Sequence, residues 1–271
     1  MQCRYRERLI IAGDWVFGEV HPEWRPAGKR RGKFRATSEM QARLNERRSA
    51  LQMTALAHEN FGKTDYNLNL TFRDGCCPAD RDELERVIRN FVARIRRIYR
   101  RAGIELRYII ERGFSGMGRP HAHIYLTGGI PREEIEAAWG LGYANCRGLE
   151  FTETGITDLS AYIAGQKREG KTDAEHVRMK GERRWTGSRN LRRPVERTNV
   201  SRYSREAMEE IADAGNPHSF FARRYPGYWL AEFPDVRQNP VTHGWECTFM
   251  LYRPDSAQLA SYARRERRRG V

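Results

Sequence analysis

The chain has 271 residues and a formal net charge of +14, with 49 Lys and Arg against 35 Asp and Glu. This length suits one large domain or one domain with extensions. The positive charge indicates a polyanionic partner, with nucleic acid as the first candidate and an anionic membrane surface as the second. No apolar run approaches the ~20 residues that a membrane-spanning helix needs, so no membrane insertion is expected.

Cysteine content favours a reducing compartment. The chain has five cysteines, which are Cys3, Cys76, Cys77, Cys146 and Cys247. They form no Cys-x-x-Cys pair and their number is odd, so neither a disulfide framework nor a zinc site is expected. The basic start of the chain precedes only a short apolar patch, which Gly13 and Asp14 interrupt. We therefore expect no signal peptide and a cytoplasmic location.

The first predicted elements are a basic arm, two helices and a strand. Residues 24–36 are rich in Arg, Lys, Gly and Pro and predict the arm. A capping box at Ser38–Gln41 predicts a helix that runs to about Ala57. Alternating apolar and polar residues predict a half-buried strand over Asp65–Phe72. The clearest helix is Asp80–Arg101, whose arginine-bearing face is of the kind that is most often simply solvated.

The second half of the chain continues this mixture of strands and helices. Ile104–Glu111 predicts a strand, and a loop with three glycines joins it to the strand ending at Leu126, which indicates a long hairpin. The later expected elements are a helix at Pro131–Trp139, a strand at Gly148–Thr152, helices at Asp158–Gln166 and Arg205–Ala214, and an aromatic-rich segment at Tyr225–Tyr252. This order predicts an α+β fold with a mainly antiparallel sheet and helices packed on it.

Two histidines in the second hairpin strand are the most informative feature of the sequence. His121 and His123 point the same way, because side chains alternate between the faces of a strand. Two imidazoles on a rigid strand form half of a metal site. The hairpin can bring the Glu111 carboxylate beside them, and this donor set suits a catalytic divalent ion. Each of the three is more often an ordinary surface residue when it stands alone, so the prediction depends on their combination.

A nucleophile for such a site is available in Tyr162, on the predicted helix that starts at Asp158. Tyrosine can act as a covalent nucleophile. Its pKa near 10 makes it a poor one unless a nearby cation or metal favours the phenolate. The common alternative is a buried core tyrosine.

Three motifs then resemble those of the HUH endonucleases, and specifically the replication initiator (Rep) proteins of small rolling-circle plasmids and related phages. Asn69–Phe72 resembles their first motif, Glu111 with Gly118–His123 their metal motif, and Leu159–Ile163 their tyrosine motif. The flanking segments Thr37–Phe61 and Arg184–Pro194 are also similar to theirs. The resemblance covers about residues 37–195.

The resemblance implies a five-stranded ferredoxin/RRM-like sheet with basic extensions at both ends. Its implied divisions are an N-terminal arm and helix (1–61), an endonuclease core (62–200) and an extension that is a candidate for DNA binding (201–271). Mg²⁺ or Mn²⁺ held by His121, His123 and Glu111 would bind the scissile phosphate. Attack by Tyr162 would give a 5′-phosphotyrosine link and a 3′-OH that primes rolling-circle replication. The implied partners are single-stranded or hairpin origin DNA, a host helicase and a DNA polymerase, in a bacterial cytoplasm.

Further residues are expected to bind the DNA or to assist the reaction of Tyr162. The basic segments would hold the backbone and an aromatic side chain could stack a base; the candidates are Arg119, Lys171, Arg184, Trp185 and Arg189. Gly165 stands where the family often has a lysine, so Lys167, Lys171 or an arginine would take that role. Asp158, one helical turn before Tyr162, is a candidate for activating water in termination, or simply an acid favoured by the helix dipole.

One competing motif and two alternative functions stay open. Gly165–Thr172 formally matches the phosphate loop G-x-x-x-x-G-K-[ST], but it follows a predicted helix and carries Gln-Lys-Arg-Glu in its interior. We therefore expect no ATP site, and DNA unwinding would depend on a host helicase. The alternatives are a transposase or relaxase with the same chemistry, and a non-catalytic DNA-binding regulator whose histidines are structural.

Overall fold

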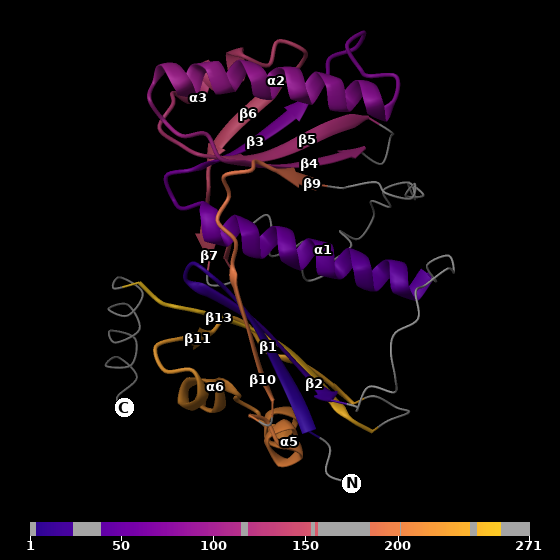
Figure 1. Cartoon of the computed structure of the whole chain (residues 1–271), viewed down its shortest axis with the longest axis vertical. Helices are drawn as coiled ribbons and strands as arrows, with labels where there is room; N and C mark the ends of the chain where they lie inside the picture. Colours follow the sequence, from indigo (N-terminus) through magenta and orange to yellow (C-terminus); the bar gives the residue numbers. More distant parts are fainter. Residues whose placement is uncertain are drawn as a thin grey trace. The chain divides into compact units, whose positions relative to one another are not determined.

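A computed structural model describes residues 4–23, 39–114, 119–152, 155–156, 185–200, 202–238 and 243–255. The chain divides into two compact units, which we describe one at a time (Figure 1). Unit 1 comprises Met1–Arg48, Thr152–Gly155 and Arg193–Val271, and unit 2 comprises Ser49–Phe151 and Ile156–Arg192. Both contain antiparallel sheets with helices, which confirms the predicted α+β class. None of the helices in these ranges is long and apolar enough to cross a membrane.

Unit 1 is built on a six-stranded antiparallel sheet with the order β10-β1-β2-β13-β11, in which β12 also pairs with β13. Its strands are β1 (Arg4–Ala12), β2 (Trp15–Glu23), β10 (Val195–Val200), β11 (Trp229–Leu230), β12 (Asp235–Gln238) and β13 (Trp245–Tyr252). The helices α5 (Arg205–Asp213) and α6 (His218–Arg224) contribute Met208, Ile211, Phe220 and Phe221 to its core. The predicted extensions 1–61 and 201–271 thus meet in one sheet, and the compact units differ from the three predicted divisions.

Gly13 and Asp14 form a hairpin turn, whereas the sequence had indicated only an interruption. Ala12 pairs with Trp15, so the two residues between them make the connection from β1 to β2. Gly13 adopts φ 56°, the left-handed conformation that a two-residue hairpin turn favours at its first central position.

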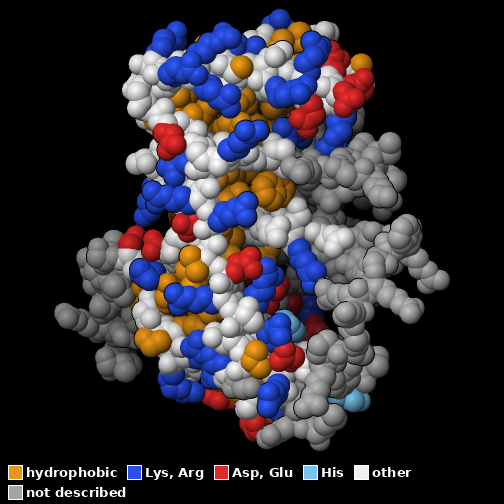
Figure 2. Space-filling view, viewed as in Figure 1, with side chains coloured by type: hydrophobic (Ala, Val, Ile, Leu, Met, Phe, Trp, Pro, Cys, Tyr) orange, Lys and Arg blue, Asp and Glu red, His pale blue; other side chains and the backbone are white. Residues whose placement is uncertain are grey.

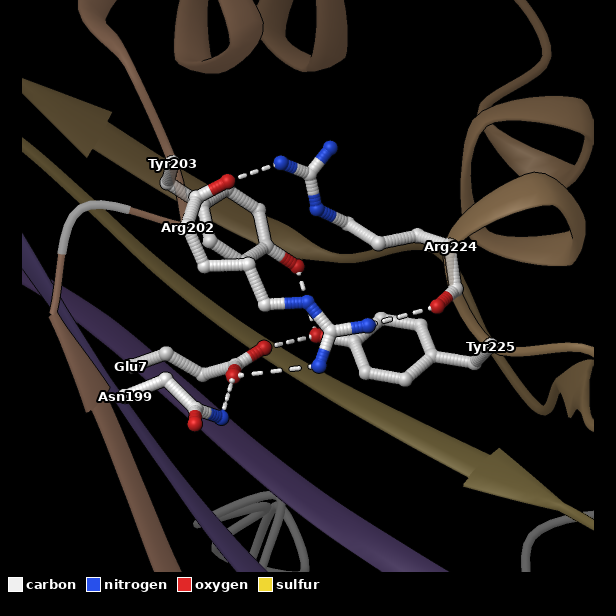
Figure 3. Close-up of polar contacts among 6 residues, drawn as sticks. All are labelled: Glu7, Asn199, Arg202, Tyr203, Arg224 and Tyr225. Atoms are coloured by element: carbon white, nitrogen blue, oxygen red, sulfur yellow. Dashed lines mark hydrogen bonds and ion pairs between the residues drawn. The ribbon is translucent and has the colours of Figure 1, made fainter.

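A charged network lies inside unit 1 (Figure 3). The side chain of Glu7 is fully buried, and its carboxylate accepts hydrogen bonds from the hydroxyl of Tyr225 and from Nδ2 of Asn199 at 2.5 Å. The guanidinium of Arg202 lies 3.6 Å from the same carboxylate. Burial raises the pKa of the Tyr225 hydroxyl, which therefore stays protonated as a donor. These partners compensate the buried charge of Glu7.

Unit 2 holds a five-stranded antiparallel sheet with the order β6-β3-β5-β4-β9. Its strands are β3 (Tyr66–Thr71), β4 (Tyr108–Phe114), β5 (Pro120–Leu126), β6 (Ala144–Gly148) and β9 (Trp185–Gly187). Its helices are the part of α1 (Glu39–Asn60) from Ser49 onward, α2 (Arg81–Arg101) and α3 (Arg132–Ala137). The strand β5 lies between β3 and β4 and is antiparallel to both, so β3, α2 and β4 form a split βαβ unit.

Helix α2 forms where its sequence predicts. Asp80 caps it, because its side chain accepts a hydrogen bond of 2.8 Å from the Glu83 amide. The buried side of α2 packs on one face of the sheet, in a cluster that includes Ile88, Phe91, Ile95, Leu68, Ala122 and Ile124. Figure 1 shows α2 and α3 on that same face. The opposite face carries a second cluster, formed by Met53, Ala57 and Phe61 with Ile109 and Tyr125.

Several element boundaries differ from the prediction. The strand expected at Gly148–Thr152 is replaced by β6 at Ala144–Gly148 and a short β7 at Phe151–Thr152, which pairs with β8 (Gly155–Ile156). The pairing of β6 with β3 sets these boundaries. It puts Cys146 opposite Leu68 and buries the Cys146 side chain, which outweighs the weak strand propensity of this segment. The strand expected from Ile104 begins at Tyr108, which pairs with Leu126 at the end of β5. The helix expected at Asp158–Gln166 lies outside the described residues.

Candidate metal and nucleic-acid site

The hairpin of β4 and β5 brings the predicted metal ligands onto one face of the sheet. Glu111 on β4 pairs with His123 on β5, and Gly113 pairs with His121. All three predicted ligands are half-buried, while the intervening Ala122 is fully buried on the α2 side. The alternation that the sequence predicted for His121 and His123 is therefore present.

Asn69 holds the imidazole of His123. It lies directly across from His123 on β3, and its Oδ1 is 2.6 Å from Nδ1 of that ring. An amide oxygen can only accept, so Nδ1 carries a proton in this contact. A hydrogen-bond acceptor on the ring nitrogen that faces away from the ion fixes the tautomer of a metal-binding histidine.

Gly113 makes room for the ring of His121. A Cβ atom at this position would lie 2.8 Å from Nε2 of His121, closer than real Cβ contacts allow. Nδ1 of His121 lies 3.4 Å from the carbonyl oxygen of Arg119, and the ring centroids of His121 and His123 are 5.2 Å apart. The absence of a side chain on β4 thus positions the second imidazole beside the first.

The chemistry of the donors fits a divalent ion. Two imidazoles and a carboxylate on adjacent strands are the ligand types of catalytic sites that keep open coordination positions. Among the residues that the structure describes, no three His, Cys, Asp or Glu side chains lie close enough together to form a metal-binding cluster. The pairing of β4 with β5 places the three predicted ligands on one face of the sheet.

Two arginines of this hairpin have acidic partners. Arg112 points to the α2 side, where it forms an ion pair of 3.0 Å with Glu85. Arg119 is exposed and pairs with Asp74. Arg119 also lines a cavity of about 400 Å³, together with Thr71, Phe72, Pro120 and His121. The open space thus lies directly beside one of the two histidines.

Helix α1 anchors both ends of the segment that contains the predicted tyrosine motif. Nδ1 of His58 lies 2.8 Å from the carbonyl oxygen of Thr54, and Nε2 accepts a hydrogen bond of 3.1 Å from the Ile156 amide. This pattern requires a neutral ring, and burial lowers the pKa of His58 to about 4. At the other end, the Arg192 amide donates 2.8 Å to Oδ1 of Asn60.

The tyrosine motif itself lies outside the described residues. The predicted site residues that also lie outside the described residues are Tyr162, Asp158, Lys167, Lys171 and Arg184. Trp185 packs partly against the core cluster beside α1, and its indole N–H donates to the carbonyl oxygen and hydroxyl of Ser49 at 3.2 and 3.0 Å. Arg189 is exposed in the turn after β9. The structure therefore gives Trp185 a packing contact in addition to its predicted DNA contact.

Asn69, Gly113 and His58 were not singled out as site residues in the sequence. The alternation along the strand contained a signal for Asn69, because it put the Asn69 side chain on the other face of the sheet from those of Leu68 and Leu70. Comparisons of the chain with protein families, with characterised proteins and with solved structures give no match. The function must therefore be argued from the geometry of the site.

Proposed function

We propose that the protein is a metal-dependent DNA-nicking enzyme of the HUH type that initiates rolling-circle replication. The observation that carries this proposal is the pairing of Glu111 with His123 on adjacent strands, with His121 on the same face. Asn69 supports it, since an acceptor on Nδ1 of His123 orients Nε2 for an ion. The net charge of +14 supports a nucleic-acid substrate.

The topology of unit 2 is also the one that we expect of this family. The sequence β3-α2-β4-β5-α3-β6 with the sheet order β6-β3-β5-β4 is a ferredoxin-like arrangement, and β9 adds the fifth strand. The proposed substrate is single-stranded or hairpin origin DNA in a bacterial cytoplasm, where a host helicase and polymerase would extend the 3′ end. A transposase or relaxase would use the same site.

The proposed reaction exchanges one phosphodiester for another. The phenol of Tyr162 loses its proton to solvent and its oxygen forms a bond to phosphorus, while the bond to the 3′ oxygen breaks and that oxygen takes up a proton to become the 3′-OH. His121, His123 and Glu111 would hold Mg²⁺ or Mn²⁺, which supplies charge neutralisation at the phosphate. The cavity beside His121 is where we place a flanking nucleotide, with Arg119 at a backbone phosphate.

A second candidate is a non-catalytic DNA-binding regulator. It would use the same net charge of +14 for binding DNA. In this case the histidines would serve only the hairpin, and the positive charge would serve duplex binding alone. The two candidates differ in whether a covalent protein–DNA product forms.

Covalent capture separates them. We would incubate the protein with Mn²⁺ and single-stranded DNA of randomised sequence that carries a fluorophore at its 3′ end. Nicking transfers the labelled 3′ fragment to the protein, and the adduct appears on a denaturing gel. We expect mass spectrometry to locate it on Tyr162, and EDTA, His121→Ala or His123→Ala to abolish it.

A matched tyrosine provides the control. Tyr162→Phe should give no adduct, whereas Tyr143→Phe, at a side chain that is 66% exposed, should react like the wild type. An adduct that survives Tyr162→Phe would exclude Tyr162 as the nucleophile. The absence of any adduct from the randomised pool would favour the regulator.

A further inference from the structure

The outer side of α2 is a face of exposed arginines. Six exposed arginines lie on it, at positions 86, 89, 96, 97, 100 and 101. Helical spacing places them on one side, because they fall within an arc of about 140° at 3.6 residues per turn. Figure 2 shows Lys and Arg side chains gathered over α2. We call this surface the α2 arginine face.

Four of these arginines have no acidic partner among the described residues. Glu83 pairs with Arg86 and Glu134 with Arg101, so those two are the exceptions. Glu85, one turn before Arg89, instead pairs with Arg112 beneath the helix. The remaining four are Arg89, Arg96, Arg97 and Arg100.

A further arginine of α2 has a structural role, because its guanidinium is hydrogen-bonded to the backbone. Arg94 donates from Nε to the carbonyl oxygen of Ala138 at 2.8 Å and from Nη2 to that of Trp139 at 3.2 Å, at the end of α3. Arg96 and Arg100, by contrast, stand one turn apart in solvent, where like charges destabilise a helix. The fold therefore gives no reason for their charge.

We propose that the α2 arginine face binds the phosphate backbone of double-stranded DNA without reading its sequence. A guanidinium matches phosphate oxygens with two parallel N–H groups. Residues 89 to 100 extend for about 17 Å along the helix, a length that corresponds to about five phosphates of one strand.

This surface is separate from the candidate metal site. Side chains of Ala122 and Ile124 pack toward α2, whereas His121 and His123 lie on the other face of the same sheet. A DNA strand bound at the histidines would therefore lie on the opposite face of the sheet from the α2 arginine face. The proposed occupant is a duplex segment, and its binding does not depend on the proposed nicking reaction.

Salt-dependent binding to a duplex of about 30 base pairs without origin sequence tests the proposal. Arg96→Gln with Arg100→Gln removes two of the proposed phosphate contacts. We expect the slope of log affinity against log salt to become shallower by about 1.8, and affinity near 100 mM salt to fall at least about tenfold. Arg96→Lys with Arg100→Lys keeps the charge and should retain most of the slope.

The matched control is Arg205→Gln with Arg223→Gln, which removes the same charge from exposed arginines that pair with Glu209 and Glu210. Equal losses in the control and the α2 double variant would overturn the proposal, as would loss in the Lys variant. So would an unchanged duplex affinity accompanied by lost binding to anionic phospholipid vesicles. Covalent capture of single strands should be unaffected, which keeps this test separate from that of the nicking site.

Discussion

Protonation of His58 should destabilise the fold in mild acid. Its ring is buried, Nε2 accepts from the Ile156 amide, and Nδ1 faces the carbonyl oxygen of Thr54. A proton added to Nε2 would put two donors face to face. Burial accordingly lowers the pKa of His58 from 6.5 to about 4. The free energy of unfolding therefore changes with pH mainly between these two values.

The magnitude follows from linkage. Above pH 6.5 the ring is neutral in both the folded and unfolded protein, so its contribution to stability is fully present. As the pH falls, the unfolded chain binds the proton first, and the free energy of unfolding decreases by about 2 kcal/mol at pH 5 and about 3 kcal/mol at pH 4. Below the folded pKa, near 4, the loss levels off.

Urea unfolding at several pH values, followed by circular dichroism, measures this loss. Carboxylates also titrate in this window, so the matched reference is His58→Gln, which cannot be protonated. The stability difference between wild type and His58→Gln should shrink by about 2 kcal/mol between pH 7 and pH 5. A difference that stays constant over this range would refute the argument that His58 is held neutral.

Three further changes test individual contacts inside one unit or the other. Asn69→Ala should weaken Mn²⁺ binding by about 10–100-fold, measured by calorimetry, because His123 loses its orienting acceptor; Asn69→Asp should restore it. Gly113→Ala should lower Mn²⁺ affinity with little change in circular dichroism, since the new Cβ would displace the ring of His121; an unchanged affinity would contradict this. Glu7→Ala should lower the free energy of unfolding in urea by about 3–5 kcal/mol, and a loss under 1 kcal/mol would mean that the buried network is dispensable.

Local patterns predicted much of unit 2. The apolar spacing of Asp80–Arg101 predicted a helix that the structure reproduces almost to the residue. The alternation around His121 and His123 placed both rings on one face, and the glycine-rich loop indicated the hairpin with Glu111. Each of these signals is contained in a short segment whose own chemistry decides its conformation.

Long-range pairing could not be predicted in the same way. In unit 1, β2 pairs with β13, with Val20 opposite Cys247, and β1 pairs with β10. No local pattern specifies a partner more than 180 residues away. The turn at Gly13 was not predicted, because a glycine followed by an acid can either interrupt an apolar run or form a hairpin turn. Asn69 was visible as a polar strand residue, but its contact with His123 depends on the register of β3 and β5.

The central claim is that His121 and His123 together hold a divalent ion. Pulsed electron paramagnetic resonance of the Mn²⁺-loaded protein measures this directly, because a bound imidazole nitrogen modulates the Mn²⁺ signal. We predict coupling to two imidazoles in the wild type and in His58→Gln, and to one imidazole in either His121→Ala or His123→Ala. A Mn²⁺ signal without imidazole coupling, or one that both alanine variants leave unchanged, would contradict the claim.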